Sequence, residues 1–301
     1  MALVGASLLT ACGDGSPATA PESPRATAAR ESGTPPPAAL PAAPSAAPLG
    51  PTPQPVAPTR TEEYLPGLAA DVYEPPAPAS GTLVVLIPGG GWSSADRSGL
   101  APLAAALAGT GMTVVSATYG TSGSDAFYPA PLEDVACAVA FAAARAIPTG
   151  VDADRVVVVG HSAGANLAAL AALAPERTST GCPYPAIAPD AFAALAGPYD
   201  VARLPWIAVS LFGVSPREDP DLWVDGNPLT HAGSRPEVPA LLLHGRDDAL
   251  VPVSFTTEFA AALESGGHQV MVDVVAGADH SGIYRVDVAA DRLADWIAAL
   301  P

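Results

Sequence analysis

The sequence predicts an α/β fold in which a mostly parallel central sheet carries helices on both faces, with a small cap or none. From residue 82 onward, short apolar stretches alternate with Ala- and Leu-rich helical stretches, as expected where helices join parallel strands. The four valines Val156–Val159 indicate a strand buried on both faces. Glycine-rich or polar turns follow several of these strands, at the ends where parallel sheets place their sites.

The predicted elements cover most of the chain after residue 61. One or two strands are expected between Tyr64 and Tyr73. Further strands are expected at residues 82–87, 112–118, 156–159, 191–196, 239–244 and 269–275. Helices are expected at residues 98–109, 128–146, 165–173, 253–264 and 285–300. The mixed segment 203–227 is expected to form a small cap or one wall of a pocket, with its aromatic rings used for packing more than for substrate contact.

A strand, a tight turn and a helix surround Ser162. The turn Gly160-His161-Ser162-Ala163-Gly164 has the pattern G-x-S-x-G. Its two glycines leave room where a β-carbon would strike a neighbouring strand or helix, and the free N–H groups of the helix favour negative charge beside the serine. A tight turn with a capping serine has the same letters. The strand–turn–helix setting nevertheless predicts that Ser162 is a nucleophile.

A serine hydroxyl needs a base to become a nucleophile, and the base needs an orienting acid. After Ser162 the chain offers Asp247 or Asp248 in the turn after strand 239–244, and then His280 in the loop after the last strand. The order serine, acid, histidine is that of the α/β-hydrolase fold. The other four histidines lie beside the serine, before the acid, or at an end of a strand. They are His161, His231, His244 and His268.

Three glycines follow strand 82–87 in the stretch Pro88-Gly89-Gly90-Gly91-Trp92. Such a loop can turn its backbone N–H groups toward the place where a carbonyl oxygen becomes an oxyanion. An ordinary glycine-rich turn has the same composition, so this motif alone leaves both interpretations open.

Together these stretches resemble the α/β-hydrolase superfamily, specifically bacterial carboxylesterases near the feruloyl and acetylxylan esterases, the kynurenine formamidases and the hormone-sensitive-lipase group. The resemblance covers about residues 80–285. Its motifs are PGGGW at 88–92, YPAPLEDV at 128–135, GHSAGANLAAL at 160–170, and HGRDDALVP at 244–252 with GADH at 277–280. It implies that Asp248 is the acid, and that the backbone N–H groups of Gly90, Gly91 and Ala163 form the oxyanion hole.

Two stretches depart from the pattern of these esterases. Pro88 stands where they usually carry a histidine that buttresses the glycine loop, so the rigidity of this loop stays open. The stretch 119–128 lacks their usual tyrosine-arginine-leucine run, which leaves the subgroup open.

The charge of the chain limits its partners. It carries 30 acidic residues against 13 basic ones, all arginine, for a net charge of −17. Such a surface repels phosphate backbones and anionic lipid, so no nucleic-acid partner is expected. The sequence has no Cys/His cluster and no G-x-G-x-x-G after a strand, and it implies neither a metal nor a cofactor. We expect a monomer that binds a small-molecule ester.

The chain begins with an apolar run at residues 2–9, followed by Cys12 at the end of Leu-Thr-Ala-Cys. Eight apolar residues are too few to span a bilayer and suit an export signal. The ending resembles the bacterial lipobox, which implies that Cys12 is acylated and that a lipid is the only membrane contact of a cell-surface protein. No Arg or Lys precedes the run. This leaves open a start farther upstream, a shortened chain, or a cysteine present by chance.

We therefore expect three regions: a lipoprotein signal segment at 1–12, a disordered Pro/Ala-rich tether at 13–60, and an α/β-hydrolase catalytic domain at 61–301. In an exported protein Cys137 and Cys182 can form a disulfide, and the alternative is two separate buried thiols.

The sequence thus predicts a serine hydrolase that cleaves carboxylic esters, with short-chain or small aromatic and acetyl esters as substrates. Ser162 attacks, His280 transfers the proton and Asp248 orients His280. Two alternatives stay open: an amidase, formamidase or peptidase on the same fold, and a non-catalytic surface binding protein on a hydrolase scaffold.

Overall fold

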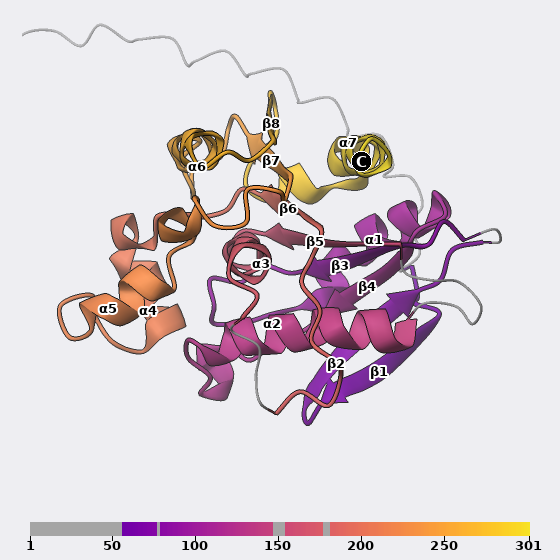
Figure 1. Ribbon diagram of the computed structural model, residues 1–301, viewed down its shortest axis with the longest axis horizontal. Coiled ribbons are helices and arrows are strands. Elements are labelled where there is room, and N and C mark those ends of the chain that lie inside the picture. The colour runs from indigo at the N-terminus through magenta and orange to yellow at the C-terminus, as the bar shows by residue number, and fades with distance from the viewer. Residues whose placement is uncertain (1–55, 77–78, 147–153, 177–180) are drawn as a thin grey trace, which may run out of the picture. The chain divides into compact units, whose positions relative to one another are not determined.

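The computed structural model describes residues 56–76, 79–146, 154–176 and 181–301 (Figure 1). The predicted lipidation site Cys12 and almost all of the predicted tether lie outside these residues. Within them, one sheet has eight strands in the order β1-β2-β4-β3-β5-β6-β7-β8. The strands are β1 Arg60–Leu65, β2 Leu68–Tyr73, β3 Thr82–Ile87, β4 Thr113–Ala117, β5 Arg155–His161, β6 Ala191–Leu195, β7 Ala240–Gly245 and β8 Val270–Val275.

The sheet is mostly parallel, as predicted. β1 pairs antiparallel with β2, and β2 pairs antiparallel with β4. All other neighbouring pairs, from β4 across to β8, are parallel. The carboxyl ends of β3, β5, β6, β7 and β8 therefore meet at one edge of the sheet, and the loops that carry the predicted site residues meet there with them.

Helices cover both faces of this sheet. The helices of the described residues are α1 Ala101–Gly109, α2 Ala130–Phe141, α3 Ala163–Leu173, α4 Pro205–Phe212, α5 Pro220–Asp225, α6 Ser254–Ser265 and α7 Val286–Ala298. Side chains of α1 and α7 belong to the apolar core on one face, and those of α2, α3 and α6 to the core on the other. None of these helices is both long enough and apolar enough to cross a membrane.

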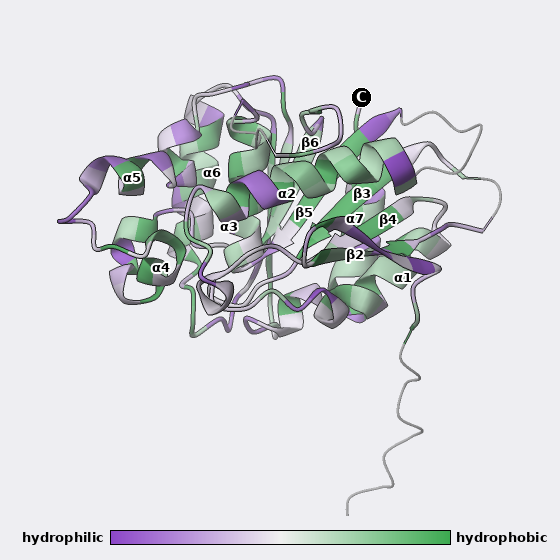
Figure 2. Ribbon diagram, turned by 90° about the horizontal axis from the view of Figure 1, so that it is seen from below, coloured by the Kyte–Doolittle hydropathy of each residue, from purple (hydrophilic) through white to green (hydrophobic). Residues whose placement is uncertain are grey.

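The central strands alternate their side chains between the two cores. In β3, Val85 and Ile87 join the core under α2 and α3, while Val84 and Leu86 join the core under α1 and α7. All six residues of β3 are buried. Figure 2 shows the same strands in hydrophobic colours between the helix layers. A strand covered on both faces has apolar residues at every position, which is why the sequence located β3 at the residues where it occurs.

The first two strands differ most from the expectation. The predicted region 64–73 holds two strands, and β1 begins before it, at Arg60. β1 is an edge strand, and Arg60 is paired there with Glu62 and Glu74. Charged side chains are a common way to protect a sheet edge from pairing with another chain. They also hide the apolar alternation by which a strand is recognised in a sequence.

The predicted cap segment contributes two short helices, α4 and α5, which lie beyond α3 at the left of Figure 1. Phe212 and Trp223 are buried against each other, with ring centroids 4.4 Å apart, and fill the interior of this unit as expected. Trp206 differs, because 72% of its surface is exposed.

A disulfide joins Cys137 of α2 to Cys182, with the Cα atoms 5.5 Å apart. Of the two alternatives that the sequence left open, the structure has the paired one. The bond closes a segment with a sequence separation of 45 residues, and this segment includes β5, the Ser162 turn and α3. Closing a loop of this size restricts the unfolded chain and typically stabilises a fold by about 2–4 kcal/mol.

Candidate active site

Ser162 lies in the turn between β5 and α3, with the unusual backbone angles φ 53° and ψ −119°. Its N–H donates to the carbonyl of Leu195 at 2.8 Å. A β-carbon on Gly160 would come within 2.1 Å of the carbonyl oxygen of Gly164, and one on Gly164 within 2.2 Å of the carbonyl oxygen of Ile87. Both glycines are therefore required by close contact, as the sequence predicted, and the strained turn holds the serine hydroxyl above the helix.

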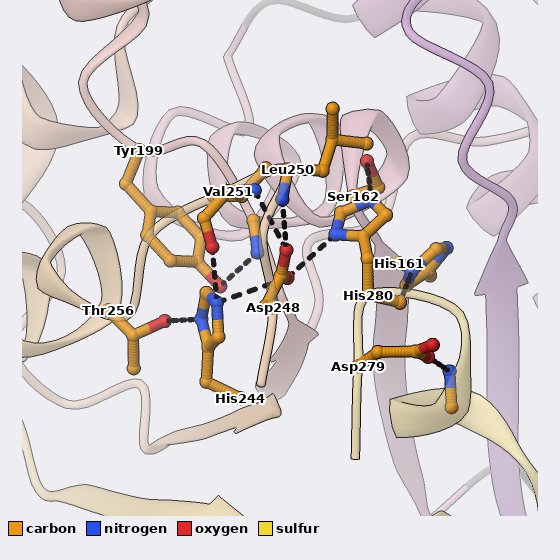
Figure 3. Close-up of polar contacts among 12 residues, drawn as sticks. His161, Ser162, Tyr199, His244, Asp248, Leu250, Val251, Thr256, Asp279 and His280 are labelled. Carbon is orange, nitrogen blue, oxygen red and sulfur yellow. Dashed lines mark hydrogen bonds and ion pairs between the residues drawn. The ribbon is translucent and has the colours of Figure 1, made fainter. Parts of the chain in front are cut away.

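The structure brings the predicted base and acid to this serine (Figure 3). His280 Nε2 lies 2.9 Å from Ser162 Oγ, and His280 Nδ1 lies 2.7 Å from Asp248 Oδ2. Ser162, Asp248 and His280 come from three loops, which follow β5, β7 and β8. The side chain of Asp248 is fully buried, whereas that of His280 is 15% exposed. This is the arrangement in which a histidine takes a proton from a serine while a carboxylate orients it.

The two neighbouring aspartates differ in burial. Asp247 is exposed to solvent, and its backbone N–H donates to the carbonyl of Ala278 at 3.0 Å. Asp248 points inward to His280. Burial raises the pKa of the Asp248 carboxyl, but hydrogen bonds from His244, His280 and the N–H of Val251 outweigh it and hold that pKa well below its usual range. Asp248 is therefore an anion at neutral pH.

His161 takes a position that the sequence did not predict. Its Nε2 lies 2.8 Å from the carbonyl oxygen of His280, and its ring packs edge-on against Tyr284, with centroids 4.5 Å apart. Burial, followed by the proximity of His280, lowers the pKa of His161 to about 4. The ring is therefore neutral at pH 7, and Nε2–H donates to the backbone of the base. The motif placed His161 beside the serine, but its partner is 119 residues away in sequence.

The glycine loop forms the opposite side of the site. Gly90, Gly91 and Ala163 all line the same cavity as Ser162. Among the hydrogen bonds of the described residues, none uses the backbone N–H of Gly90 or Gly91. Ala163 is the first residue of α3, where an N–H has no partner within the helix. Three N–H groups are thus available at the place where the sequence predicted oxyanion donors.

The segment after β4 holds this loop in place. The Tyr119 hydroxyl donates to the carbonyl of Pro88 at 3.0 Å. The backbone N–H of Ser122 donates to the carbonyl of Trp92 at 2.9 Å, and the Thr121 hydroxyl donates to the carbonyl of Ser93 at 3.2 Å. The loop is therefore fixed without the histidine that Pro88 replaces. These contacts were missed because the sequence carries no pattern that links residues 88–93 to residues 119–122.

A cavity of about 600 Å³ contains Ser162 and His280 in its wall. α4 contributes Trp206 and Ile207 to it, and the loop after β7 contributes Leu250. Trp206 is 72% exposed and Leu250 is 55% exposed, so both present apolar surface at the wall of the cavity. The cavity thus carries exposed apolar groups next to a polar reaction centre, as small-molecule sites commonly do.

The charged groups of the cavity have one sign. Asp96 is the only carboxylate among the described residues that line it, and no arginine is among them. Hydrogen bonds from the hydroxyl and N–H of Ser98 lower the pKa of Asp96. The carboxylate is thus ionised at neutral pH, and its charge repels anionic ligands from the cavity.

Comparison with known proteins yields one family and several relatives. The BD-FAE family model matches residues 70–263. A probable carboxylic ester hydrolase of Mycobacterium tuberculosis, LipM, is 32% identical over 207 residues, which cover 64% of this chain and 48% of that protein. The kynurenine formamidase avaC of Aspergillus versicolor is 32% identical over 171 residues, which cover 48% of this chain and 58% of that protein. The chain thus spans about half the length of these relatives.

A solved structure supports the same fold. A thermophilic esterase from Thermogutta terrifontis superimposes with a TM-score of 0.63 at 23% identity, over 82% of this chain and 94% of that one. At this identity the likeness concerns the fold, and it confirms the α/β-hydrolase fold that the sequence predicted.

The depressed pKa of His161 predicts a pH-dependent stability. The pKa is about 4 in the folded protein and about 6.5 in an unfolded chain. Between these values the unfolded state binds the extra proton, so the free energy of unfolding rises with pH across this window, by about 3 kcal/mol from this group. Urea unfolding of the wild type and of His161→Gln at pH 4.5, 5.5 and 6.5 measures this pH dependence of the free energy of unfolding. The difference between the two proteins should widen as the pH rises.

The ring of His161 also packs against its neighbours, so the variant is expected to be less stable at every pH. A constant difference that does not change with pH would mean that only this packing matters. Such a result would contradict a neutral, buried His161.

Proposed function

This chain belongs to the BD-FAE family, and on that premise we propose that it hydrolyses carboxylic esters through a covalent acyl-enzyme on Ser162. The observation that carries the proposal is the hydrogen-bonded line from Ser162 Oγ through His280 to Asp248 in the wall of a cavity. The relative LipM, which is named as a probable carboxylic ester hydrolase, adds support.

The reaction follows from the roles of these groups. Ser162 Oγ attacks the carbonyl carbon of the ester while His280 Nε2 takes the hydroxyl proton. The carbonyl oxygen becomes an oxyanion, which the N–H groups of Gly90, Gly91 and Ala163 stabilise. His280 then gives the proton to the departing alcohol. Water repeats the sequence on the acyl-enzyme, with His280 as base, and releases the carboxylic acid and free Ser162.

The anionic Asp248 has two effects on His280. By accepting from Nδ1–H it keeps Nε2 free to take the serine proton, and it stabilises the positive ring that forms in each transition state. The contact between His161 and the carbonyl of His280 acts on the backbone of the base, so the ring is held from two directions.

The cavity suggests the substrate. Its volume of about 600 Å³ and its exposed Trp206 and Leu250 suit a small ester with an apolar or aromatic group. The Asp96 carboxylate and the absence of arginine among the described lining residues favour uncharged esters over anionic ones. We propose short-chain, acetyl or small aromatic esters. The relative avaC, which is named as a kynurenine formamidase and is 32% identical over 171 residues, keeps amide cleavage as a second candidate.

We also propose that the protein is a cell-surface lipoprotein of a bacterium, held through an acylated Cys12. The Leu-Thr-Ala-Cys ending of an apolar run supports this, as does the Pro- and Ala-rich stretch that separates Cys12 from β1. The disulfide between Cys137 and Cys182 is in keeping with an oxidising compartment.

Removal of the nucleophile tests the main proposal. The full-length chain should hydrolyse p-nitrophenyl acetate, and Ser162→Ala should lower kcat by about 10⁴-fold or more. If the folded wild type is no faster than this variant, simple ester hydrolysis is contradicted, and the amide-cleaving and binding-protein alternatives are favoured. Comparison of kcat/KM for this ester and for an N-formyl aryl amide separates the esterase from the formamidase.

Two adjacent glycines test the oxyanion loop. A β-carbon on Gly90, at φ 143°, would lie 2.1 Å from the carbonyl oxygen of Ser94, whereas one on Gly91, at φ 58°, meets nothing within 4 Å. Gly90→Ala should therefore displace the loop and lower kcat by about 10²-fold or more, the effect of a lost oxyanion donor. Gly91→Ala keeps its N–H and should cost only about 1–2 kcal/mol of stability. Equal kcat values for the two variants would argue against this loop as the oxyanion hole.

A fatty-acid label tests the anchor. When residues 1–301 are expressed in a bacterium supplied with a labelled fatty acid, the wild type should carry the label and enter the detergent phase. Cys12→Ser should do neither, while Ser162→Ala should behave like the wild type. Labelling that survives the loss of Cys12 would refute the proposed site.

A further inference from the structure

We propose that His244 is a positioning residue for Asp248, and that the buried Thr256 hydroxyl, which donates to His244 Nδ1, sets the orientation of the His244 ring. This inference rests on the proposed function. In the sequence His244 is the end of a predicted strand, and neither His244 nor Thr256 takes part in the reaction steps above.

The donors around Asp248 are the first observation. Its Oδ1 accepts from the backbone N–H groups of Leu250 and Val251, both at 2.8 Å. Its Oδ2 accepts from His280 Nδ1 at 2.7 Å, and His244 Nε2 lies 3.3 Å from the same oxygen. Oδ2 is thus held from two sides by two histidines (Figure 3).

The contacts of His244 determine which of its nitrogens carries the proton. The side chain is fully buried. Nε2 faces two acceptors, Asp248 Oδ2 and the carbonyl oxygen of Val251 at 2.8 Å, so this nitrogen must carry a proton. Nδ1 lies 2.6 Å from the hydroxyl oxygen of Thr256.

Thr256 completes the contacts of His244. With its proton on Nε2, the ring accepts at Nδ1, so the Thr256 hydroxyl donates to Nδ1. Both nitrogens of this buried ring then have a partner, as buried polar groups normally do.

The donor to His244 is held in the core. Thr256 lies on α6 and is fully buried. Phe259 of the same helix stacks on the buried ring of Tyr199, with centroids 4.4 Å apart. His244 therefore approaches Asp248 from a fixed direction, independently of His280.

The consequence concerns the base. If the donor from His244 is lost, Oδ2 is held only by His280, and the carboxylate is freer to turn away from it. A His280 ring that is less well oriented spends less time with Nε2 directed at the hydroxyl of Ser162. We expect this to lower kcat with little effect on KM, because His244 contacts Asp248 and does not line the cavity.

Two variants of His244 test the role. His244→Gln retains an N–H near the position of Nε2, whereas His244→Met has a similar volume and no donor. With p-nitrophenyl acetate, His244→Met should lower kcat by about tenfold or more, a small part of the effect of losing the triad acid. KM should change by less than about threefold in both variants, and His244→Gln should retain most of the wild-type kcat. A loss of uniform substrate binding would instead raise KM and leave kcat unchanged.

The same substitution in an Asp248→Asn background separates positioning from general damage. If His244 acts through Asp248, His244→Met should have almost no further effect on kcat there, because interacting residues are not additive. If His244→Met lowers kcat by the same factor in both backgrounds, the proposal is overturned. Equal kcat values for the Gln and Met variants would overturn it as well.

Thr256→Val provides a second route if His244→Met does not fold. It removes the hydroxyl that donates to Nδ1 and should lower kcat in the Asp248 background but not in the Asp248→Asn background. An unchanged kcat would remove Thr256 from the proposal. Failure of the proposed function is distinguishable from all these results, since the wild type and Ser162→Ala would then be equally inactive.

Discussion

The close approach of α3 to the sheet at Ser162 is the constraint on which the rest of the site depends. Neither Gly160 nor Gly164 has room for a β-carbon, because it would lie only 2.1 Å or 2.2 Å from a backbone carbonyl oxygen. Only with this approach can Ser162 take a positive φ, present its hydroxyl to His280 and leave the N–H of Ala163 free. All residues of α3 are buried, and its many alanines let it lie deep between the sheet and its neighbours.

The second requirement is a carboxylate that stays charged inside the protein. Burial alone would favour the neutral acid at Asp248, and an uncompensated buried charge would destabilise the fold. Donors on both oxygens reverse this balance. The retained charge sets the tautomer of His280. The same hydrogen-bond network therefore stabilises the Asp248 anion and orients the His280 base.

The sequence predicted what local patterns record, and it missed what distant contacts decide. β3 and β5 are apolar at nearly every position because both faces are covered, so the pattern located them. β1 is a charged edge strand and its start was missed. Asp247 and Asp248 are identical in type and adjacent, and only the resemblance to known esterases chose between them before burial did. The pairing of Cys137 with Cys182 likewise depends on a distance that no local pattern encodes.

The two departures from the esterase pattern meet in one contact. Pro88 replaces the histidine expected to buttress the glycine loop, and the segment after Tyr119 lacks the expected run. In the structure Tyr119 donates to the carbonyl of Pro88, and Ser122 donates to the carbonyl of Trp92. Proline fixes its own φ and keeps its carbonyl as an acceptor. The loop is thus held through its carbonyl groups by an outside segment, which leaves its N–H groups free for an oxyanion, so that the loss of the histidine need not loosen the site.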